Sequence, residues 1–262
     1  MNNSTSIHPD QWCIPLECDH DGRISAENHK SLFHYCKLSD LENILRSSAI
    51  KLNNLINIGK NSEYERKNVD QDFWGLIFVA CFALNEKSRA LWNDFADNHY
   101  GVCIQFVYRN SFFEEVINKE KTAIGYSMAD KKICEIGYNL SSVKMPKPTC
   151  IPNVNTDIIL DIKLTDVSYT NTPQSSTVYI ENGKMANISN IAQCVPTGFS
   201  HEMETRAIGV LRATHDVELS QIDYILLPIR LTNIKLIFGK KVCMTDRKKY
   251  SDMLHTKTIL NK

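Results

Sequence analysis

Short apolar segments alternate with longer polar stretches along the chain, and most of the apolar segments have the length of β-strands. The strongest is Leu76–Ala83, whose Ile, Phe and Val side chains predict a strand buried on both faces. Leu32–Cys36 and Gly101–Phe106 are shorter but equally apolar. By the same criterion, further strands are predicted over residues 158–164, 167–169, 205–211, 224–229 and 234–238.

Four segments are predicted to be helices, because apolar residues recur at helical spacing or follow a capping signal. In residues 40–47, Leu41, Ile44 and Leu45 form one apolar face, and Ser39 with Glu42 reads as a capping box. The other helices are predicted to start at Ser88, with Leu91, Trp92, Phe95 and Ala96 on one face, at Ser111, running to about Lys119, and at Thr245, running to Thr256.

The remaining stretches are polar and predict loops, over residues 53–65, 144–152 and 170–196. Strands outnumber helices, and they do not alternate with helices as a doubly wound parallel sheet requires. We therefore expect an α+β fold. Residues 1–30 are polar and irregular and predict an N-terminal arm, which leaves 31–262 as one domain.

The balance of charges bears on whether the chain binds nucleic acid. Lys and Arg together number 30 and are matched by 30 Asp and Glu, so the chain lacks the positive surplus typical of proteins that follow a phosphate backbone. This argues against tight nonspecific binding of nucleic acid. A local basic groove stays compatible with a net charge of zero.

Several features predict a soluble cytoplasmic protein without a metal site. The N-terminus has neither the basic start nor the apolar stretch of a secretory signal. The longest apolar run, Leu76–Leu84, is far shorter than the roughly 20 residues that cross a bilayer. Nine scattered cysteines suit a reducing compartment, and Cys13, Cys18 and His20 are not followed by a second ligand pair at zinc spacing.

Two places along the chain carry residues suited to chemistry. One is Phe33-His34-Tyr35 in a predicted strand, and the other is Glu202-Met203-Glu204 just before Arg206. If the second segment enters a strand, the two glutamates point to the same face. Paired carboxylates are typical of sites that move protons, although a solvated strand end with an ion pair gives the same pattern. A His-Tyr pair in a strand is also compatible with a purely structural role.

The order of the motifs resembles a widespread bacterial family of unknown function whose motifs are similar to those of ADP-ribosyltransferases. The resemblance runs from about Leu32 to Leu254. Its parts are the Phe33-His34-Tyr35 strand with the following helix, a loop with Asn61 and Glu65, Cys81-Phe82-Ala83 where the family has Cys-Phe-Ser, Leu91-Trp92, Gly101–Phe106, and the late Glu-x-Glu-x-Arg of residues 202–206. The loop lacks the family's Asp-Pro, and Ala83 lacks its hydroxyl.

This resemblance implies a split, mostly antiparallel sheet with flanking helices that binds NAD in a cleft. The absence of a Gly-x-Gly-x-x-Gly turn agrees with a route to NAD other than a Rossmann fold. Glu204 would stabilise the cation left when the nicotinamide–ribose bond breaks, and Glu202 would orient or deprotonate the acceptor. The expected NAD-binding residues are His34 at a ribose hydroxyl, Tyr35 or Phe82 at the nicotinamide, Asn61, Arg206 at a phosphate or Glu65, and Trp92, for which a place in the core is the more common role.

The resemblance also implies a bacterial toxin or defence effector that transfers ADP-ribose to a macromolecule and is restrained by an antitoxin or another inhibitory protein. The acceptor stays open between a protein, RNA or DNA bases, and water. A non-catalytic module of the same fold that binds a nucleotide or a protein is the alternative, favoured by Ala83 and the altered loop around Asn61.

Overall fold

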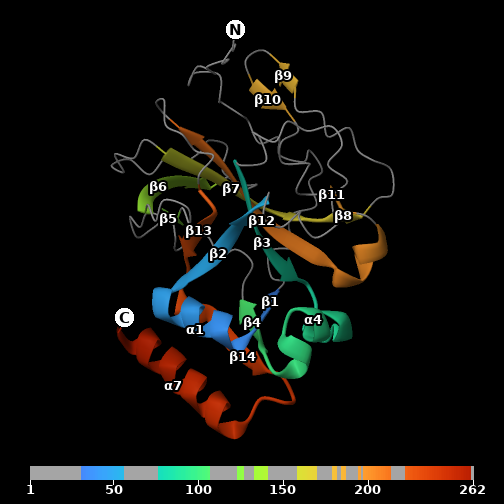
Figure 1. The fold of residues 1–262 in the computed structure, drawn as a ribbon, viewed down its shortest axis with the longest axis vertical. Coiled ribbons are helices and arrows are strands. Elements are labelled where there is room, and N and C mark those ends of the chain that lie inside the picture. Colours follow the sequence, from blue (N-terminus) through green and yellow to red (C-terminus); the bar gives the residue numbers. More distant parts are fainter. Residues whose placement is uncertain are drawn as a thin grey trace.

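The computed structural model of the 262-residue chain describes most of the sheet and the helices that flank it. The described residues are 31–55, 76–106, 123–126, 133–140, 158–169, 179–181, 184–186, 194–195, 197–213 and 222–260. Their arrangement is drawn in Figure 1. The predicted arm 1–30, the predicted helix from Ser111 to Lys119 and the loop 144–152 lie outside these ranges.

A ten-stranded sheet forms the centre of the molecule and curls back on itself. Seven of its strands close a ring, because β12 pairs with both β7 and β3. In order around the ring they are β12 (Glu204–Ala213), β7 (Ile158–Asp166), β6 (Ile133–Leu140), β5 (Ala123–Tyr126), β13 (Tyr224–Pro228), β2 (Ala49–Asn54) and β3 (Ile77–Ala83). Within this sheet β6 and β7 pair in parallel and the other pairs are antiparallel.

The other three strands branch from the ring at β3. The beginning of β3 pairs with β2, at Phe78 opposite Asn54, whereas its end pairs with β1 (Leu32–Cys36), at Ala83 opposite Phe33. From β1 the branch continues through β4 (Val102–Phe106) to β14 (Ile234–Phe238). The fork brings the end of β3, the strand β1 and the start of β12 together.

Two short pairings lie beside the main sheet. The strand β8 (Ser168–Tyr169) runs parallel to β11 (Cys194–Val195), and β9 (Tyr179–Glu181) pairs with β10 (Lys184–Ala186). Part of the stretch predicted as the loop 170–196 therefore forms strands. Three 3₁₀ turns complete the described elements, at η4 (Asp97–His99), η5 (Thr197–Glu202) and η6 (Leu231–Asn233).

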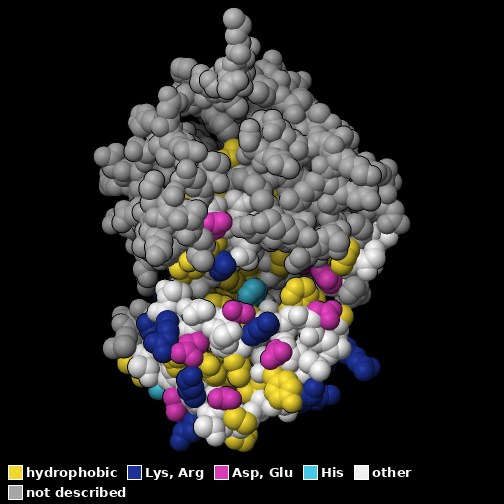
Figure 2. Space-filling view, in the orientation of Figure 1, with side chains coloured by type: hydrophobic (Ala, Val, Ile, Leu, Met, Phe, Trp, Pro, Cys, Tyr) yellow, Lys and Arg dark blue, Asp and Glu magenta, His cyan; other side chains and the backbone are white. Residues whose placement is uncertain are grey.

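Three helices in the described ranges flank the sheet. The helices α1 (Leu38–Ser47) and α7 (Met244–Leu260) lie side by side at one end of the molecule, and α4 (Arg89–Asp94) follows β3 on the other side of the branch (Figure 1). Acidic and basic side chains are interspersed over the end that α1 and α7 form (Figure 2). None of the helices in the described ranges combines the length and the apolar character needed to cross a bilayer.

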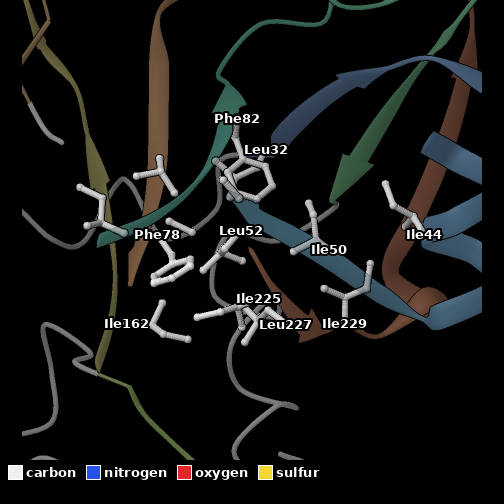
Figure 3. Packing of buried hydrophobic residues seen from close by; sticks show 14 of the residues in the cluster. Leu32, Ile44, Ile50, Leu52, Phe78, Phe82, Ile162, Ile225, Leu227 and Ile229 are labelled. Atoms are coloured by element: carbon white, nitrogen blue, oxygen red, sulfur yellow. The ribbon is translucent and has the colours of Figure 1, made fainter. Parts of the chain in front are cut away.

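Two clusters of buried side chains hold these parts together. The larger fills the space between α1 and the ring, where Ile44, Leu52, Phe78 and Phe82 pack with side chains from β13 and β7 (Figure 3). The smaller lies between β1 and α4 and contains Phe33, Tyr35, Ala83, Leu91, Trp92, Ala96 and Cys103. Gly101 permits this packing, because a Cβ there would lie 2.4 Å from the carbonyl oxygen of Cys36.

The sequence predicted most of the described elements. The strands expected in and around residues 32–36, 76–83, 101–106, 158–164, 205–211, 224–229 and 234–238 are all present, as are the three predicted helices that fall within the described residues. The Ser88 cap is confirmed, since its Oγ accepts the Leu91 N–H at 3.4 Å. The fold class is therefore α+β, with a mostly antiparallel sheet.

Besides the loop 170–196, three further local predictions were wrong. The capping box at Ser39 is absent, because α1 begins at Leu38, which packs against the core, and places Ser39 inside the helix. The loop expected from Asn53 is still strand at Asn54, a buried residue whose side-chain amide donates to the Ile222 carbonyl at 3.0 Å. Phe95, expected on the buried face of α4, is 47% exposed because the helix ends before it.

Candidate active site

A pocket opens at the fork of the sheet, where β1, the end of β3 and the start of β12 meet. Its empty volume is about 380 Å³, part of it open to solvent. The lining comes from β1, β3, α4 and the junction of η5 with β12: Phe33, His34, Tyr35, Cys81, Phe82, Ala83, Leu91, Phe95, Glu202 and Glu204. Five of the residues expected at the site therefore share one pocket: Glu204, Glu202, His34, Tyr35 and Phe82.

The two glutamates reach the pocket by a route that differs from the predicted one. Glu202 is the last residue of η5 and Glu204 is the first of β12, so strand alternation does not relate them. Met203 between them adopts a left-handed conformation, with φ of 45°. This turn, rather than the pleat of a strand, brings both carboxylates to the pocket. A non-glycine residue in that conformation is strained, which is common at functional sites.

Glu204 is the more buried of the two glutamates, and an arginine holds it. Its side chain is 7% exposed and that of Arg206 is 3% exposed. Arg206 donates from Nε at 3.0 Å and from Nη2 at 2.7 Å, and both hydrogen bonds end on Oε2 of Glu204. Oε1 accepts no hydrogen bond from the described residues. The two oxygens of this buried carboxylate therefore differ, because Arg206 binds only one of them.

Neighbouring strands fix the backbone at this point. The N–H of Glu204 donates to the hydroxyl oxygen of Tyr169 at 2.8 Å, and the Glu204 carbonyl accepts the Val167 N–H at 2.9 Å. The next residue, Thr205, donates from its hydroxyl to Asp166 at 2.6 Å. Burial raises the pKa of Tyr169 to about 12, so this hydroxyl stays protonated at neutral pH.

His34 presents a neutral imidazole to the pocket. Its Nδ1 lies 2.9 Å from the carbonyl oxygen of Cys81, and because a carbonyl only accepts, Nδ1 carries the proton. Burial lowers the pKa of His34, against the opposing effect of that hydrogen bond. The remaining nitrogen, Nε2, is therefore an acceptor, suited to a hydroxyl group of a ligand.

The aromatic residues divide between the pocket and the packing behind it. Phe82 lies on β3 beside His34, with ring centroids 5.8 Å apart. The hydroxyl of Tyr35 donates to the Asn85 carbonyl at 2.6 Å, and its ring meets Trp92 edge to face at 5.2 Å. Burial raises the pKa of Tyr35. Tyr35 thus offers the pocket a fixed ring, because its hydroxyl is already bound to protein.

Two of the residues expected at the NAD site do not line the pocket. Trp92 lies behind Tyr35, stacks on His99 at 5.3 Å and donates from Nε1 to the Glu86 carbonyl at 3.0 Å. Arg206 lies behind Glu204 and donates to it. Asn61 and Glu65 lie outside the described residues.

Sequence reasoning missed three contributors. Tyr169 and Asp166 support the start of β12, and Phe95 lines the pocket from the end of α4. Tyr169 and Phe95 come from elements that were predicted, whereas Asp166 lies between two predicted strands. Nothing in the sequence indicated that β8 and the end of β7 pass beside Glu204.

The arrangement can bind a ligand that has hydroxyl groups and a flat ring, and it can stabilise a positive charge near Glu204. A fixed carboxylate in a site shielded from water is an effective stabiliser of a developing cation. In the described ranges, no group of three His, Cys, Asp or Glu side chains is arranged to hold a metal ion. Cys13, Cys18 and His20 lie outside them.

Comparison with known proteins does not assign the chain to a family. No protein-family model matches it, and neither a curated protein nor a solved structure matches it significantly.

Proposed function

We propose that this chain is an NAD-dependent ADP-ribosyltransferase of the split-sheet kind, with Glu204 as the residue that stabilises the transition state. One observation carries the proposal. The carboxylate of Glu204 is almost fully buried in a pocket, and its Oε1 has no hydrogen-bond partner among the described residues. A buried carboxylate in that position is costly unless water or a ligand completes its hydrogen bonds, and the pocket gives either of them access.

The lining of the pocket suits the part of NAD that reacts. Phe82 and the fixed ring of Tyr35 provide apolar surfaces for a flat nicotinamide. The acceptor nitrogen of His34 suits a ribose hydroxyl, as does Oε1 of Glu204. The resemblance in sequence assigned these residues the same roles, and they come from three segments that only the fold brings together.

In the proposed reaction the bond between C1′ of the ribose and the nicotinamide nitrogen breaks, and its electron pair leaves with nicotinamide. Glu204 stabilises the positive charge that develops on the ribose. Glu202, less buried and at the same pocket, accepts the proton of the incoming nucleophile. The products are nicotinamide, the ADP-ribosylated acceptor and one proton.

We propose a macromolecule as the acceptor of ADP-ribose. That an inhibitory protein restrains the chain stays a prediction from the resemblance. The experiment incubates purified chain with NAD labelled in its adenylate part and with cell extract. Nicotinamide release and label in protein and in nucleic acid are measured separately, beside Glu204→Gln and beside Glu42→Gln as a control on α1.

Label in protein or in nucleic acid that needs Glu204 but not Glu42 supports the transferase and identifies the acceptor class. Nicotinamide release without label transfer indicates hydrolysis of NAD, with water as acceptor. A chain that neither binds nor cleaves NAD contradicts the proposal and favours a non-catalytic module.

A further inference from the structure

The ion pair behind the pocket has an asymmetric geometry. An arginine and a carboxylate gain most when two N–H groups meet two different oxygens. Here Nε and Nη2 of Arg206 both donate to Oε2 of Glu204, at 3.0 and 2.7 Å. The ion pair is therefore weaker than one in which each oxygen accepts a hydrogen bond, and Oε1 has no bond to Arg206.

The surroundings keep this geometry fixed. Arg206 lies in β12 between two strands, opposite Cys81 of β3 and Thr165 of β7. Its side chain is 3% exposed, so it has no room to swing toward solvent. Since residues two apart in a strand share a face, Arg206 meets Glu204 from the same side of β12.

We infer that Arg206 is a positioning residue, which orients the carboxylate of Glu204 so that Oε1 faces the pocket and which does not itself contact NAD. This inference rests on the proposed function. It gives Arg206 a role different from the phosphate contact expected from the sequence. Its consequence is that Arg206 acts on the chemical step through Glu204.

Kinetics separate this role from the two alternatives. An arginine that binds a phosphate of NAD raises the dissociation constant when it is replaced, because it contributes to binding. An arginine with only a structural role changes the fraction of folded protein and leaves the turnover of each folded molecule unchanged. A positioning residue lowers kcat and leaves NAD affinity near the wild-type value.

The test compares Arg206→Lys with wild type, Glu204→Gln and the double variant Glu204→Gln/Arg206→Lys. Lysine keeps the positive charge but cannot donate from two directed nitrogens to one oxygen. We expect kcat for nicotinamide release to fall about 100-fold, as for a catalytic group displaced by about 1 Å, with the NAD dissociation constant changed less than about threefold. The double variant should be no slower than Glu204→Gln, because both substitutions remove the same effect, the stabilisation of the transition state by the oriented Glu204 carboxylate.

Turnover is expressed per folded molecule. If Arg206→Lys does not fold, Glu204→Gln/Arg206→Gln, which removes both charges of the buried pair together, is compared with Glu204→Gln in the NAD titration, and a weaker affinity in that double variant would overturn the inference. Wild-type kcat in a folded Arg206 variant would overturn the inference alone, as would a raised dissociation constant with unchanged kcat. A double variant whose kcat falls by the product of the two single reductions would also overturn the inference. A wild-type chain that neither binds nor cleaves NAD would overturn the proposed function together with this inference.

Discussion

Two glutamates in this protein are each held by an arginine, and the two arrangements differ at the oxygen atoms. On the outer face of α1, both oxygens of Glu42 have protein partners. Arg46 donates to Oε1 at 3.0 and 2.7 Å, while Lys249 at 3.0 Å and Tyr250 at 3.2 Å donate to Oε2. In the pocket, Arg206 donates to one oxygen of Glu204 and leaves the other.

The two glutamates also differ in their surroundings: Glu42 links two helices at the surface, and Glu204 lines the pocket. Arg46 and Lys249 lower the pKa of Glu42 to about 2, and the group ties α1 to α7 at the surface, where water and salt screen its charge. Glu204 and Arg206 lie in the interior, where a charge is costly without a partner. Both oxygens of Glu42 have protein partners, whereas Oε1 of Glu204 has none among the described residues, and the proposed function requires this difference.

The largest effect should come from removing the buried cation. Arg206→Gln leaves the charge of Glu204 uncompensated in the interior, which should lower the free energy of unfolding by about 3–5 kcal/mol. Arg46→Gln, the matched change at the surface, should leave stability near wild type. Urea unfolding of both variants measures this, and equal losses would contradict the comparison.

Next in size is the catalytic effect of Glu204. Glu204→Gln keeps the shape of the side chain and removes its charge, so nicotinamide release should fall about 10²–10³-fold. The dissociation constant of NAD, measured by isothermal titration, should change little. Glu42→Gln is the control, since its carboxylate does not line the pocket and is bound by side chains of α1 and α7. Loss of turnover in that variant would contradict the difference drawn between the two glutamates.

His34 should contribute to binding rather than to the chemical step. His34→Ala removes the acceptor nitrogen at the pocket, and we expect NAD affinity to weaken about tenfold, equal to one lost hydrogen bond. His255→Ala, exposed on α7, should bind as wild type does. An NAD affinity in His34→Ala equal to that of wild type would contradict the binding role assigned to His34.

The lowered pKa of His34 also predicts a dependence of stability on pH. The unfolded chain takes up a proton near the ordinary value of 6.5, whereas the folded chain resists it. Stability should therefore be complete above pH 6.5 and fall as the pH drops below it, by at most about 1.4 kcal/mol per pH unit for this group. Melting curves from pH 5 to 7 should be flatter for His34→Gln than for wild type or His255→Gln.

The smallest effect should come from the turn between the two glutamates. Met203 has φ of 45°, so glycine at this position should relieve strain and raise the free energy of unfolding by up to about 1 kcal/mol. Met203→Ala keeps the unfavourable conformation and should show no gain. Thermal unfolding of the two variants measures the difference, and a gain in both would refute strain as the cause.

The sequence predicted the elements of the fold better than their pairing. Runs such as residues 76–83 are apolar enough to identify a buried strand, and Ser88 identifies the start of α4. The curl of the sheet depends on β12 pairing with both β3 and β7, and no local pattern encodes a partner that far along the chain. The capping box at Ser39 failed for a related reason, since core packing of Leu38 decides where α1 begins.

The candidate site was predicted in part for the same reason. Glu202, Glu204, His34, Tyr35 and Phe82 were identified from motifs, and all five line the pocket. The alternation argument for the glutamates was wrong, because the left-handed turn at Met203 cannot be inferred from a methionine. Tyr169 and Asp166 carry no motif, and only the neighbouring strands show that they support Glu204.

The most direct test of the central claim is nicotinamide release from NAD by the purified chain, measured for wild type, Glu204→Gln and Glu42→Gln at equal folded concentration. We expect wild type and Glu42→Gln to release nicotinamide at the same rate, and Glu204→Gln to release it at about 1% of that rate or less. Equal rates in wild type and Glu204→Gln, or no release by wild type, would contradict it.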